Sequence, residues 1–346
     1  MTLNAITDVP GIKVGHWSNR RGATGCTVVL AEAGATGAYI NAGGAPGTID
    51  TDLLRPENSI QRVHAVLLTG GTIYGQEAAA GVRAHLRDKG VGYRMGENTA
   101  LIPIVVGANL FDVGIGSGYA HPTIDSGRRA AARATGGRVE QGTVGAGTGC
   151  TVAKLDGRDT ALKSGIGTAS VEHESGLVVG AIVAVNAVGD VYDPATGELI
   201  AGPRGKRRGQ MRSGADIAID KPLADYLGEA ERADSTTTGN TTIGVVATNA
   251  RLDKGTATRF AIMANEGLAA AIRPAHTPAD GDSIFVLATN EFDIDVAATP
   301  ALVTLLGTMA ARAVSQAILN GVHAATGLAG VPSPSEWRAR RKRPST

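Results

Sequence analysis

Hydrophobic positions along the chain form short runs that predict buried strands. The runs are rich in valine and isoleucine, and most are flanked by glycine, asparagine or aspartate, as is usual for strands covered on both faces. The predicted strands cover residues 27–30, 65–68, 102–106, 177–188, 243–248 and 284–288.

Longer segments with apolar residues along one stripe predict helices. They cover residues 74–89, 125–134, 257–272 and 300–324. In the first of them, alanine and leucine share a stripe, while Arg83, Arg87 and Asp88 lie off it. The mixture of strands and helices predicts an α/β or α+β fold in which helices cover the faces of a sheet.

Composition narrows the class of protein. The chain has 346 residues, enough for one large domain or two modest ones. Hydrophobic residues make up 43% but aromatic residues only 3%, so the core must be built from alanine, valine, leucine and isoleucine. The 48 glycines follow no fixed period and indicate tight turns and close backbone approaches. A formal net charge of +1 gives no reason to expect a nucleic-acid or membrane partner.

Cysteine usage and the N-terminal residues indicate a cytoplasmic protein. Cys26 and Cys150 are too few for a disulfide scaffold and are expected to be buried thiols in a reducing compartment. Residues 1–8 lack the basic start and apolar centre of a signal peptide. No apolar run approaches the ~18 residues of a membrane span.

Two polar segments look exposed and irregular. Within residues 190–239, the basic cluster at 204–209 is typical of a solvated loop, with phosphate or RNA binding as the alternative. A long loop that ends at Thr241 would also leave the peptide bond there free to strain. The tail, residues 337–346, is expected to be a disordered basic end; a nucleic-acid or targeting role is the alternative.

Several familiar motifs are absent. The stretch Gly145-Ala146-Gly147-Thr148-Gly149-Cys150 lacks the third glycine of a dinucleotide loop. The histidines form no helical His-x-x-x-His pair, and no serine sits in a Gly-x-Ser-x-Gly elbow. We therefore expect neither a cofactor nor a metal ion.

The stretch Thr238-Gly239-Asn240-Thr241-Thr242-Ile243 carries the most informative pattern. A turn-forming Gly-Asn pair meets Thr241 directly before an apolar run. If the bond after Asn240 breaks, Thr241 acquires a free α-amine, which can take the proton of its own hydroxyl because such amines titrate near ~7.7–8.0. The pattern thus suits a self-cleaving N-terminal nucleophile hydrolase, although a plain turn before a strand has the same form.

The pair Asp280 and Asp282 lies directly before the apolar run 284–288. Side chains two residues apart on an extended segment point the same way. Two close carboxylates repel, so one is expected to have a raised pKa and to serve as an acid. A surface turn with two solvated acids is the alternative. In the first interpretation the pair lies at the mouth of one strand, as Thr241 lies at the mouth of another.

Three further polar residues stand next to apolar or glycine-rich segments. Asn186 lies inside an apolar strand, where it would satisfy a bulge or donate to an oxyanion. Lys154 follows Thr151-Val152-Ala153 and is either an exposed strand end or a buried charge beside a site. Tyr74 follows Gly70 and Gly71, whose backbone could approach a ligand closely; a glycine turn with Tyr74 packed in the core is the alternative.

Together these residues make the chain resemble the L-aminopeptidase/D-esterase family of self-processing hydrolases, which includes β-peptidyl aminopeptidases and 6-aminohexanoate (nylon) oligomer hydrolases. The resemblance runs from about Ile6 to about Leu319. The blocks that carry it are Ile6-Thr7-Asp8-Val9-Pro10-Gly11-Ile12-Lys13-Val14-Gly15-His16, Gly43-Gly44-Ala45-Pro46-Gly47-Thr48, Gly70-Gly71-Thr72-Ile73-Tyr74-Gly75, Gly145-Ala146-Gly147-Thr148-Gly149 and Gly239-Asn240-Thr241-Thr242-Ile243.

The resemblance implies a four-layer αββα sandwich, similar to that of the ornithine acetyltransferases. It also implies a cut between Asn240 and Thr241 that leaves residues 1–240 and 241–346 together as two subunits. Thr241 would be the nucleophile, and Asp280 and Asp282 would orient it and its amine. Lys154 and Tyr74 would line the site. Asn186 would contribute to the oxyanion hole, together with backbone amides near Gly70 and Gly71 or Gly145–Gly149.

Many relatives have serine as the nucleophile, and some have Ser-x-Glu where this chain has Asp280-Gly281-Asp282. The threonine and the paired aspartates look more like the nylon oligomer hydrolases. The expected substrates are small peptides, amides or esters with a free amino end. The apolar helices also make a homo-oligomer of cut heterodimers plausible. Two other functions remain open, namely an acyltransferase of the ornithine acetyltransferase type and an uncut binding protein on the same scaffold.

Overall fold

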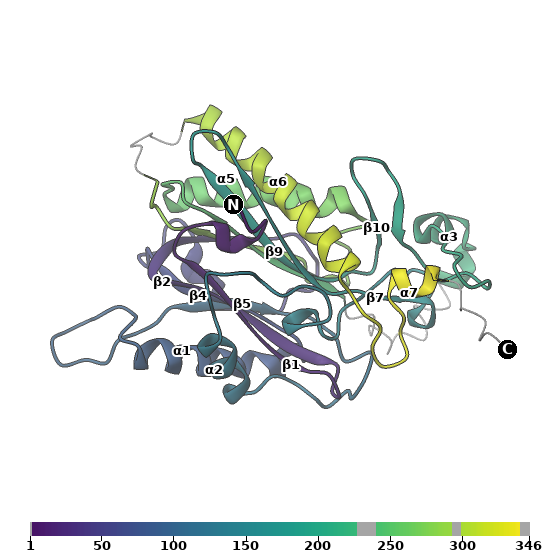
Figure 1. Cartoon of the computed structure of the whole chain (residues 1–346), viewed down its shortest axis with the longest axis horizontal. Coiled ribbons are helices and arrows are strands. Elements are labelled where there is room, and N and C mark those ends of the chain that lie inside the picture. The colour runs from purple at the N-terminus through teal and green to yellow at the C-terminus, as the bar shows by residue number, and fades with distance from the viewer. Residues whose placement is uncertain (1, 227–239, 293–298, 340–346) are drawn as a thin grey trace.

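The computed structural model describes residues 2–226, 240–292 and 299–339. Within these residues, nine strands form one continuous sheet that folds into two halves (Figure 1). The first half contains β3 (Thr48–Ile49), β5 (Val105–Asn109), β4 (Val63–Thr69), the start of β2 (Thr24–Asn41) and β1 (Ile12–Asn19). The second half contains the end of β2, β14 (Ser283–Ala288), β12 (Thr241–Thr248), β9 (Val178–Asn186) and β8 (Ile166–Glu172).

The long strand β2 joins the two halves. Its first part pairs with β1 and β4, and its last part, from Thr36 to Asn41, pairs with β14. The register between β2 and β4 shifts between Leu30 and Ala35, an irregularity of the kind that bends a strand. The bend lets one strand belong to both layers of the sandwich.

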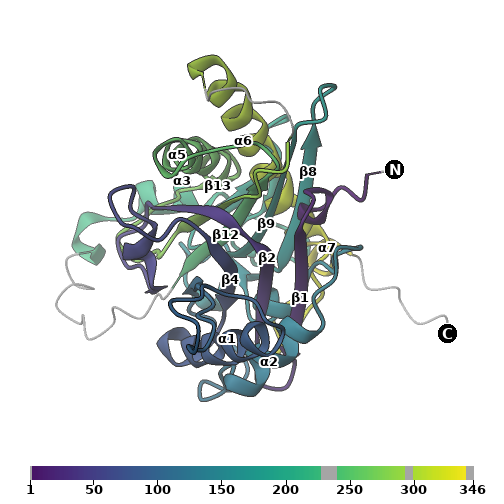
Figure 2. The same cartoon turned by 90° about the vertical axis from the view of Figure 1, so that its left-hand side faces the viewer.

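Four main helices cover the two outer faces of the sheet (Figure 2). The first half packs against α1 (Ala78–Asp88) and α2 (Ile124–Ala132), and the second half packs against α5 (Lys254–Ala271) and α6 (Pro300–His323). The N-termini of α5 and α6 are capped by Asp253 and Thr299, whose side chains accept the Thr256 and Leu302 N–H groups.

Three hydrophobic clusters separate these layers. One lies between the second half and α5/α6 and includes Phe260 and Leu306. A second lies between the two halves and includes Ile243 and Phe285, and the third lies between the first half and α1/α2 and includes Leu86. Three clusters between four layers make the αββα sandwich, which confirms the expected fold class.

The pairing of β12 places three strand ends at one edge of the sheet. β12 runs parallel to β14 and antiparallel to β9, with Thr241 opposite Asn186 and Ile243 opposite Ser283. The starts of β12 and β14 therefore meet the end of β9. This edge collects most of the polar residues that the sequence singles out.

The predicted strands and helices are all present, with some boundaries displaced. The fifth strand, β5, begins at Val105 rather than at 102, and the helix predicted at 74–89 begins as a 3₁₀ turn, η3 (Thr72–Glu77). The strands β1 and β8 were not predicted, because polar and small residues interrupt their apolar positions. The remaining short elements are η1 (Ile6–Asp8), η2 (Thr51–Leu54), η4 (Gly145–Gly147), η5 (Arg158–Thr160), β6 (Thr151–Val152) and β7 (Leu162–Lys163).

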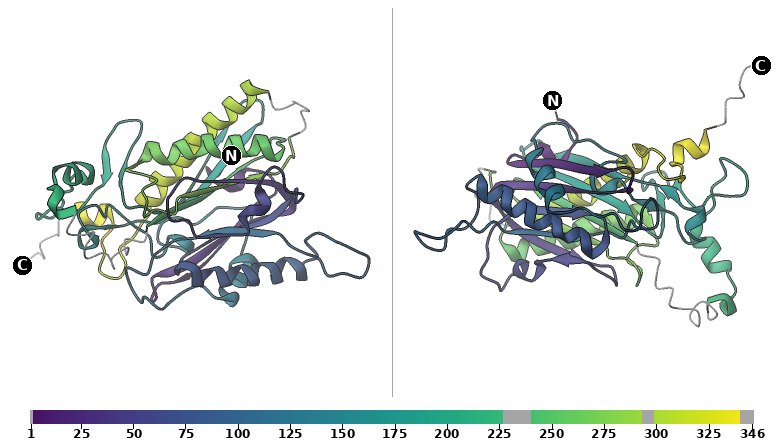
Figure 3. Two further views of the ribbon diagram at one scale, coloured as in Figure 1. Left: turned by 180° about the vertical axis from the view of Figure 1, so that it is seen from behind. Right: turned by 90° about the horizontal axis from the view of Figure 1, so that it is seen from below.

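The segment expected to be irregular contains ordered structure. A small sheet of β10 (Asp190–Tyr192), β11 (Leu199–Ala201) and β13 (Ile272–Arg273) forms there, followed by α3 (Gly214–Asp220). These elements project from one end of the sandwich (Figure 3). Residues 227–239, which include the Ser235–Gly239 stretch before the expected cut, lie outside the described residues.

Part of the tail that was expected to be disordered is ordered, namely residues 337–339. Trp337 belongs to α7 (Pro334–Arg338), and its indole Nε1 donates to the Gln210 carbonyl oxygen at 2.8 Å. The guanidinium groups of Arg204 and Arg208 lie over the indole ring, which explains why this basic end is ordered. Residues 340–346 lie outside the described part of the chain.

Cys26 and Cys150 are buried free thiols, as expected. By length and composition, α6 could cross a membrane, a feature that the search for apolar runs did not predict. Its side chains at Leu306, Ala313 and Ile318 are buried in the cluster against the second half of the sheet. That packing is typical of a core helix.

Candidate active site

Thr241 is the first residue of β12 and is only 4% exposed. In the uncut chain, its hydroxyl donates to the carbonyl oxygen of Asn240, the residue before it. The Gly281 N–H donates to the same oxygen at 3.2 Å. The hydroxyl thus lies beside the peptide bond that it would attack, and a backbone donor already faces the oxygen on which negative charge would develop.

Gly281 comes so close to Thr241 that a side chain would not fit. A Cβ at this position would lie 2.9 Å from Thr241 Oγ1 and 2.7 Å from the Ala45 carbonyl oxygen. The second contact is to backbone, which cannot move aside as a flexible side chain would. The glycine between the two aspartates therefore has a steric function.

If the chain cuts itself after Asn240, we expect Gly281→Ala to slow that cleavage about tenfold or more, because overpacking costs about 1–3 kcal/mol and the displaced atom is the oxygen that would attack. The measurement is the fraction of cut chain against time by denaturing mass spectrometry. Gly255→Ala serves as the control, because the nearest atom to its added Cβ is 3.5 Å away. Equal cleavage rates for the two variants would contradict the steric argument.

Lys154 is buried beside the same residues. Its Nζ donates to Asn186 O and Asn186 Oδ1 at 3.0 Å each, and to Asn240 Oδ1 at 2.8 Å. Burial, and to a smaller extent the positive charge of Arg158, lower the pKa of Lys154 to about 7, against the attraction of Asp280. Of the two readings from the sequence, the buried charge is correct and the exposed strand end is wrong.

Asn186 connects Lys154 to the neighbouring loops. It is the last residue of β9 and lies in continuous register opposite Thr241, so it does not serve a bulge in that pair. Its Oδ1 also accepts the Thr151 N–H at 3.0 Å, and its Nδ2 donates to the Phe111 carbonyl oxygen at 2.8 Å. These contacts fix the amide plane at the edge where Thr241 lies.

The two aspartates are buried, so the surface-turn alternative is wrong. Asp280 Oδ2 accepts the Thr277 N–H at 3.1 Å and the Thr277 hydroxyl at 2.5 Å. Asp280 Oδ1 is buried and has no hydrogen-bond partner among the described residues. Burial raises the pKa of Asp280, and the neighbouring Asp282 carboxylate raises it further, as expected for a close pair.

Asp282 makes a different set of contacts. Its Oδ1 accepts the Thr242 N–H at 2.7 Å, and its Oδ2 accepts the backbone N–H of His276 at 2.9 Å. It is therefore tied to the residue directly after the expected nucleophile. Asn240 and Asp280 also pair as an isolated parallel bridge, which brings both carboxylates to the start of β12.

The glycine and tyrosine candidates lie apart from this cluster. Tyr74 is 65% exposed and its ring packs against His121, so the alternative in which it lies in the core is wrong. The Gly70 N–H donates to Gly25 O at 2.8 Å, and the Gly71 N–H donates to Asp112 Oδ1 at 2.7 Å. Both amides already have acceptors within the fold, and the backbone N–H that contacts the Asn240 carbonyl oxygen is that of Gly281.

Several residues at the site escaped the sequence analysis. Phe111 and Thr151 act through backbone groups, which no side-chain pattern reveals. His276 lies six residues before Asp282 and contacts it. Its closeness to the acidic pair along the sequence is the only feature that could have predicted this contact. Lys163 is fully buried and donates to the carbonyl oxygens of Gly147, Cys150 and Ser164, so it holds the loop that carries Thr151.

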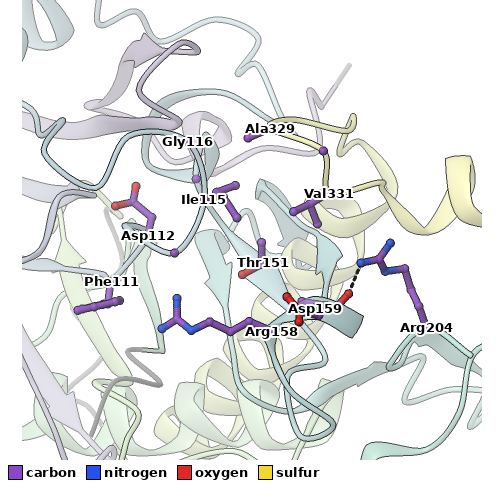
Figure 4. A pocket seen from close by; sticks show the side chains of 14 residues that line it. Phe111, Asp112, Ile115, Gly116, Thr151, Arg158, Asp159, Arg204, Ala329 and Val331 are labelled. Atoms are coloured by element: carbon purple, nitrogen blue, oxygen red, sulfur yellow. Dashed lines mark hydrogen bonds between the residues drawn. The ribbon is translucent and has the colours of Figure 1, made fainter. Parts of the chain in front are cut away.

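A cavity of about 390 Å³ adjoins the cluster (Figure 4). Phe111 and Thr151, which both hydrogen-bond to Asn186, line it together with Arg158 and Asp112. The Arg158 guanidinium lies 5.4 Å from the centre of the Phe111 ring. Burial raises the pKa of Asp112 to about 6. The cavity can hold a small polar molecule, and it is linked to Asn186 through Phe111 and Thr151.

The same residues offer little to a metal ion. In the described ranges, His, Cys, Asp and Glu side chains form no group of three that could hold one. The chemistry available here is that of a hydroxyl nucleophile, two carboxylates, a buried amine and fixed N–H donors.

Comparison with known sequences gives the same picture over nearly the whole chain. Peptidase family S58 matches residues 4–334. An uncharacterized aminopeptidase of Mycobacterium tuberculosis (strain ATCC 25618 / H37Rv) is 42% identical over 348 residues, which cover 96% of this chain and 97% of that protein. A 6-aminohexanoate-oligomer endohydrolase of Kocuria sp. (strain KY2) is 32% identical over 289 residues, 83% of this chain and 75% of that protein.

Solved structures share the fold at lower identity. The L-aminopeptidase D-Ala-esterase/amidase of Ochrobactrum anthropi, described as a variant of the N-terminal nucleophile hydrolase fold, has a TM-score of 0.68 at 19% identity and covers 95% of this chain and 88% of its own. A beta-aminopeptidase of Burkholderia sp. has a TM-score of 0.65 at 23% identity and covers 97% and 92%.

Proposed function

The chain belongs to peptidase family S58, and from this premise we propose that it cuts itself between Asn240 and Thr241 and then uses Thr241 to hydrolyse amide bonds of small substrates that have a free amino end. The family and the fold make it a hydrolase of peptide or amide bonds. The observation that carries the finer proposal is the contact of the Thr241 hydroxyl and the Gly281 N–H with one oxygen, that of the Asn240 carbonyl.

Self-cleavage would proceed by an N→O acyl shift. The Thr241 oxygen attacks the Asn240 carbonyl carbon while the Gly281 N–H stabilises the oxyanion. The hydroxyl proton passes to a base and then to the Thr241 nitrogen as the peptide bond breaks. Asp280 is the candidate base, because its Oδ1 is a buried acceptor with no hydrogen-bond partner among the described residues, and burial together with Asp282 raises its pKa. Water then hydrolyses the ester, which leaves a carboxylate on Asn240 and a free amine on Thr241.

In the cut enzyme, that new amine replaces Asp280 as the base. It takes the proton of the Thr241 hydroxyl as the oxygen attacks the substrate carbonyl, and it returns the proton to the leaving amine. The acyl-enzyme is then hydrolysed by water. Asp280 Oδ1 is placed to pair with an ammonium group, either that of Thr241 or that of the substrate. The cavity beside Asn186 would hold the remainder of the substrate.

Relatives support the choice of bond. The names aminopeptidase and 6-aminohexanoate-oligomer endohydrolase both describe cleavage of amides. The two rival functions differ in their products. An acyltransferase would pass the acyl group to an added amine instead of water, and a binding protein would stay uncut and release no product.

The test combines two measurements. Denaturing mass spectrometry with N-terminal sequencing should find a smaller piece that begins Thr241-Thr242-Ile243. The cut protein should then hydrolyse aminoacyl anilides much faster than their N-acetylated forms, with the free acid as the product even when an amine acceptor such as ornithine is present. A chain that stays uncut after long incubation would favour the binding protein, and acylated ornithine as the main product would favour the acyltransferase.

A further inference from the structure

His276 lies against Asp282 from outside the cluster described above. It belongs to the turn between β13 and β14, and its backbone φ of +60° lies in the left-handed region that few residues other than glycine adopt. Its Nδ1 lies 3.0 Å from Asp282 Oδ2, and its Nε2 lies 3.0 Å from Asn265 Nδ2 on α5. The imidazole therefore bridges the helix layer and the acidic pair.

The hydrogen-bond pattern determines which imidazole nitrogen carries the proton. The Asn265 amide N–H donates to Nε2, so Nδ1 carries a hydrogen and donates to Asp282 Oδ2. Asp282 Oδ2 therefore receives a hydrogen bond from the imidazole in addition to that from the His276 backbone.

These contacts hold both oxygens of Asp282. Oδ2 is bound by His276 through two donors, and Oδ1 accepts the Thr242 N–H at 2.7 Å. The adjacent Thr277 holds Asp280 through its own backbone and side chain. Two consecutive residues thus bind one carboxylate each, which keeps two buried acids from turning toward each other or sharing a proton.

We infer that His276 is a positioning residue for the reaction: through Asp282 it holds the Thr242 peptide, and thereby places the Thr241 hydroxyl against the Asn240 carbonyl. This inference rests on the proposed function, because it assigns His276 a part in self-cleavage. The imidazole does not touch the reacting atoms. Its effect passes through one carboxylate and one backbone N–H, so it should be seen in rates and not in substrate binding.

The experiment compares two variants that both tolerate the left-handed backbone. Glycine and asparagine are the residues best suited to this φ. His276→Gly removes the imidazole donor, and His276→Asn puts an amide N–H near the position of Nδ1. The backbone N–H to Asp282 remains in both. We expect His276→Gly to cut itself at least about tenfold more slowly, because hydrogen bonds to charged groups contribute roughly that factor or more. His276→Asn should recover most of the rate.

The readouts separate positioning from general loss of structure. Once cut, the His276→Gly enzyme should show a lowered kcat for an aminoacyl anilide at nearly unchanged KM. All rates are measured under conditions in which circular dichroism shows that the variant is folded. Equal cleavage rates for wild type, His276→Gly and His276→Asn would overturn the inference while self-cleavage itself stands. If His276→Asn cuts itself as slowly as His276→Gly, the inference is also overturned, because restoring the donor would then have no effect on the rate. A wild-type chain that never cuts itself would instead refute the proposed function, and this inference with it.

Discussion

Replacing Thr241 with valine should leave the chain uncut and inactive. Valine keeps the β-branched shape of threonine and removes only the hydroxyl, so the buried start of β12 should stay packed. The hydroxyl supplies the attacking oxygen for self-cleavage and, in the cut enzyme, for the substrate. Its loss should lower both rates by about a thousandfold or more, since removal of a nucleophile costs at least that much in comparable hydrolases.

The serine variant is the matched control for this experiment. Thr241→Ser keeps the hydroxyl and loses one methyl group, so it should still cut itself, within about tenfold of the wild-type rate. Denaturing mass spectrometry measures the cut fraction, and anilide hydrolysis measures activity. A Thr241→Val chain that cuts itself at the same bond and hydrolyses substrate would refute the assignment of the nucleophile. If both variants fail to cut while remaining folded, the methyl group would matter as much as the oxygen.

Sequence alone predicted the residues that lie close together along the chain. Thr241 and the acidic pair each precede an apolar run, and a strand start is a local pattern. Because β12 and β14 are parallel neighbours, these two starts meet at one edge. The raised pKa of one aspartate was predicted from like-charge repulsion alone, whereas in the structure burial is the larger cause and the neighbouring Asp282 carboxylate the second.

Contacts between distant segments were predicted only where family resemblance supplied them. Lys154 reaches Asn240 across 86 positions of sequence, and no period or spacing reports that contact. The contact of the Gly281 N–H with the Asn240 carbonyl oxygen was not predicted, because a backbone donor has no sequence signature. The β8 strand was missed because its buried Thr168 and Ala169 do not resemble an apolar run.

The second large effect concerns Lys154. We expect Lys154→Met to slow self-cleavage about a hundredfold, because the change removes the buried hydrogen bonds from Nζ to Asn186 and Asn240, and loss of a hydrogen bond to a charged group costs about 1.5–3 kcal/mol. Methionine fills much of the volume of the lysine stem, so a packing defect is minimised. Arg158→Met is the comparison variant, since it removes a neighbouring positive charge that lowers the Lys154 pKa but leaves the Lys154 amine in place.

The pH dependence of self-cleavage tests the form in which Lys154 acts. Three acceptors surround Nζ, and only the protonated amine has three hydrogens to donate. Because burial lowers the Lys154 pKa to about 7, that form is lost as the pH rises through about 7 and not near 10.5. Asp280 must be ionised to act as a base, so the rate should first rise as the pH passes through its raised pKa. The uncut chain has no Thr241 amine, so the profile is free of that titration.

The bell-shaped profile should therefore lose its alkaline limb in Lys154→Met, while the acidic limb remains. In Arg158→Met, the alkaline limb should move to higher pH, because removal of the positive charge lets Lys154 keep its proton longer. The measurement is the first-order rate of cutting by rapid pH jump and mass spectrometry. A wild-type rate that increases through pH 7, with that increase lost in Lys154→Met, would mean that the neutral amine is the active form. Lys154 would then be the base that takes the Thr241 proton, and Asp280 would serve only to hold the resulting charge.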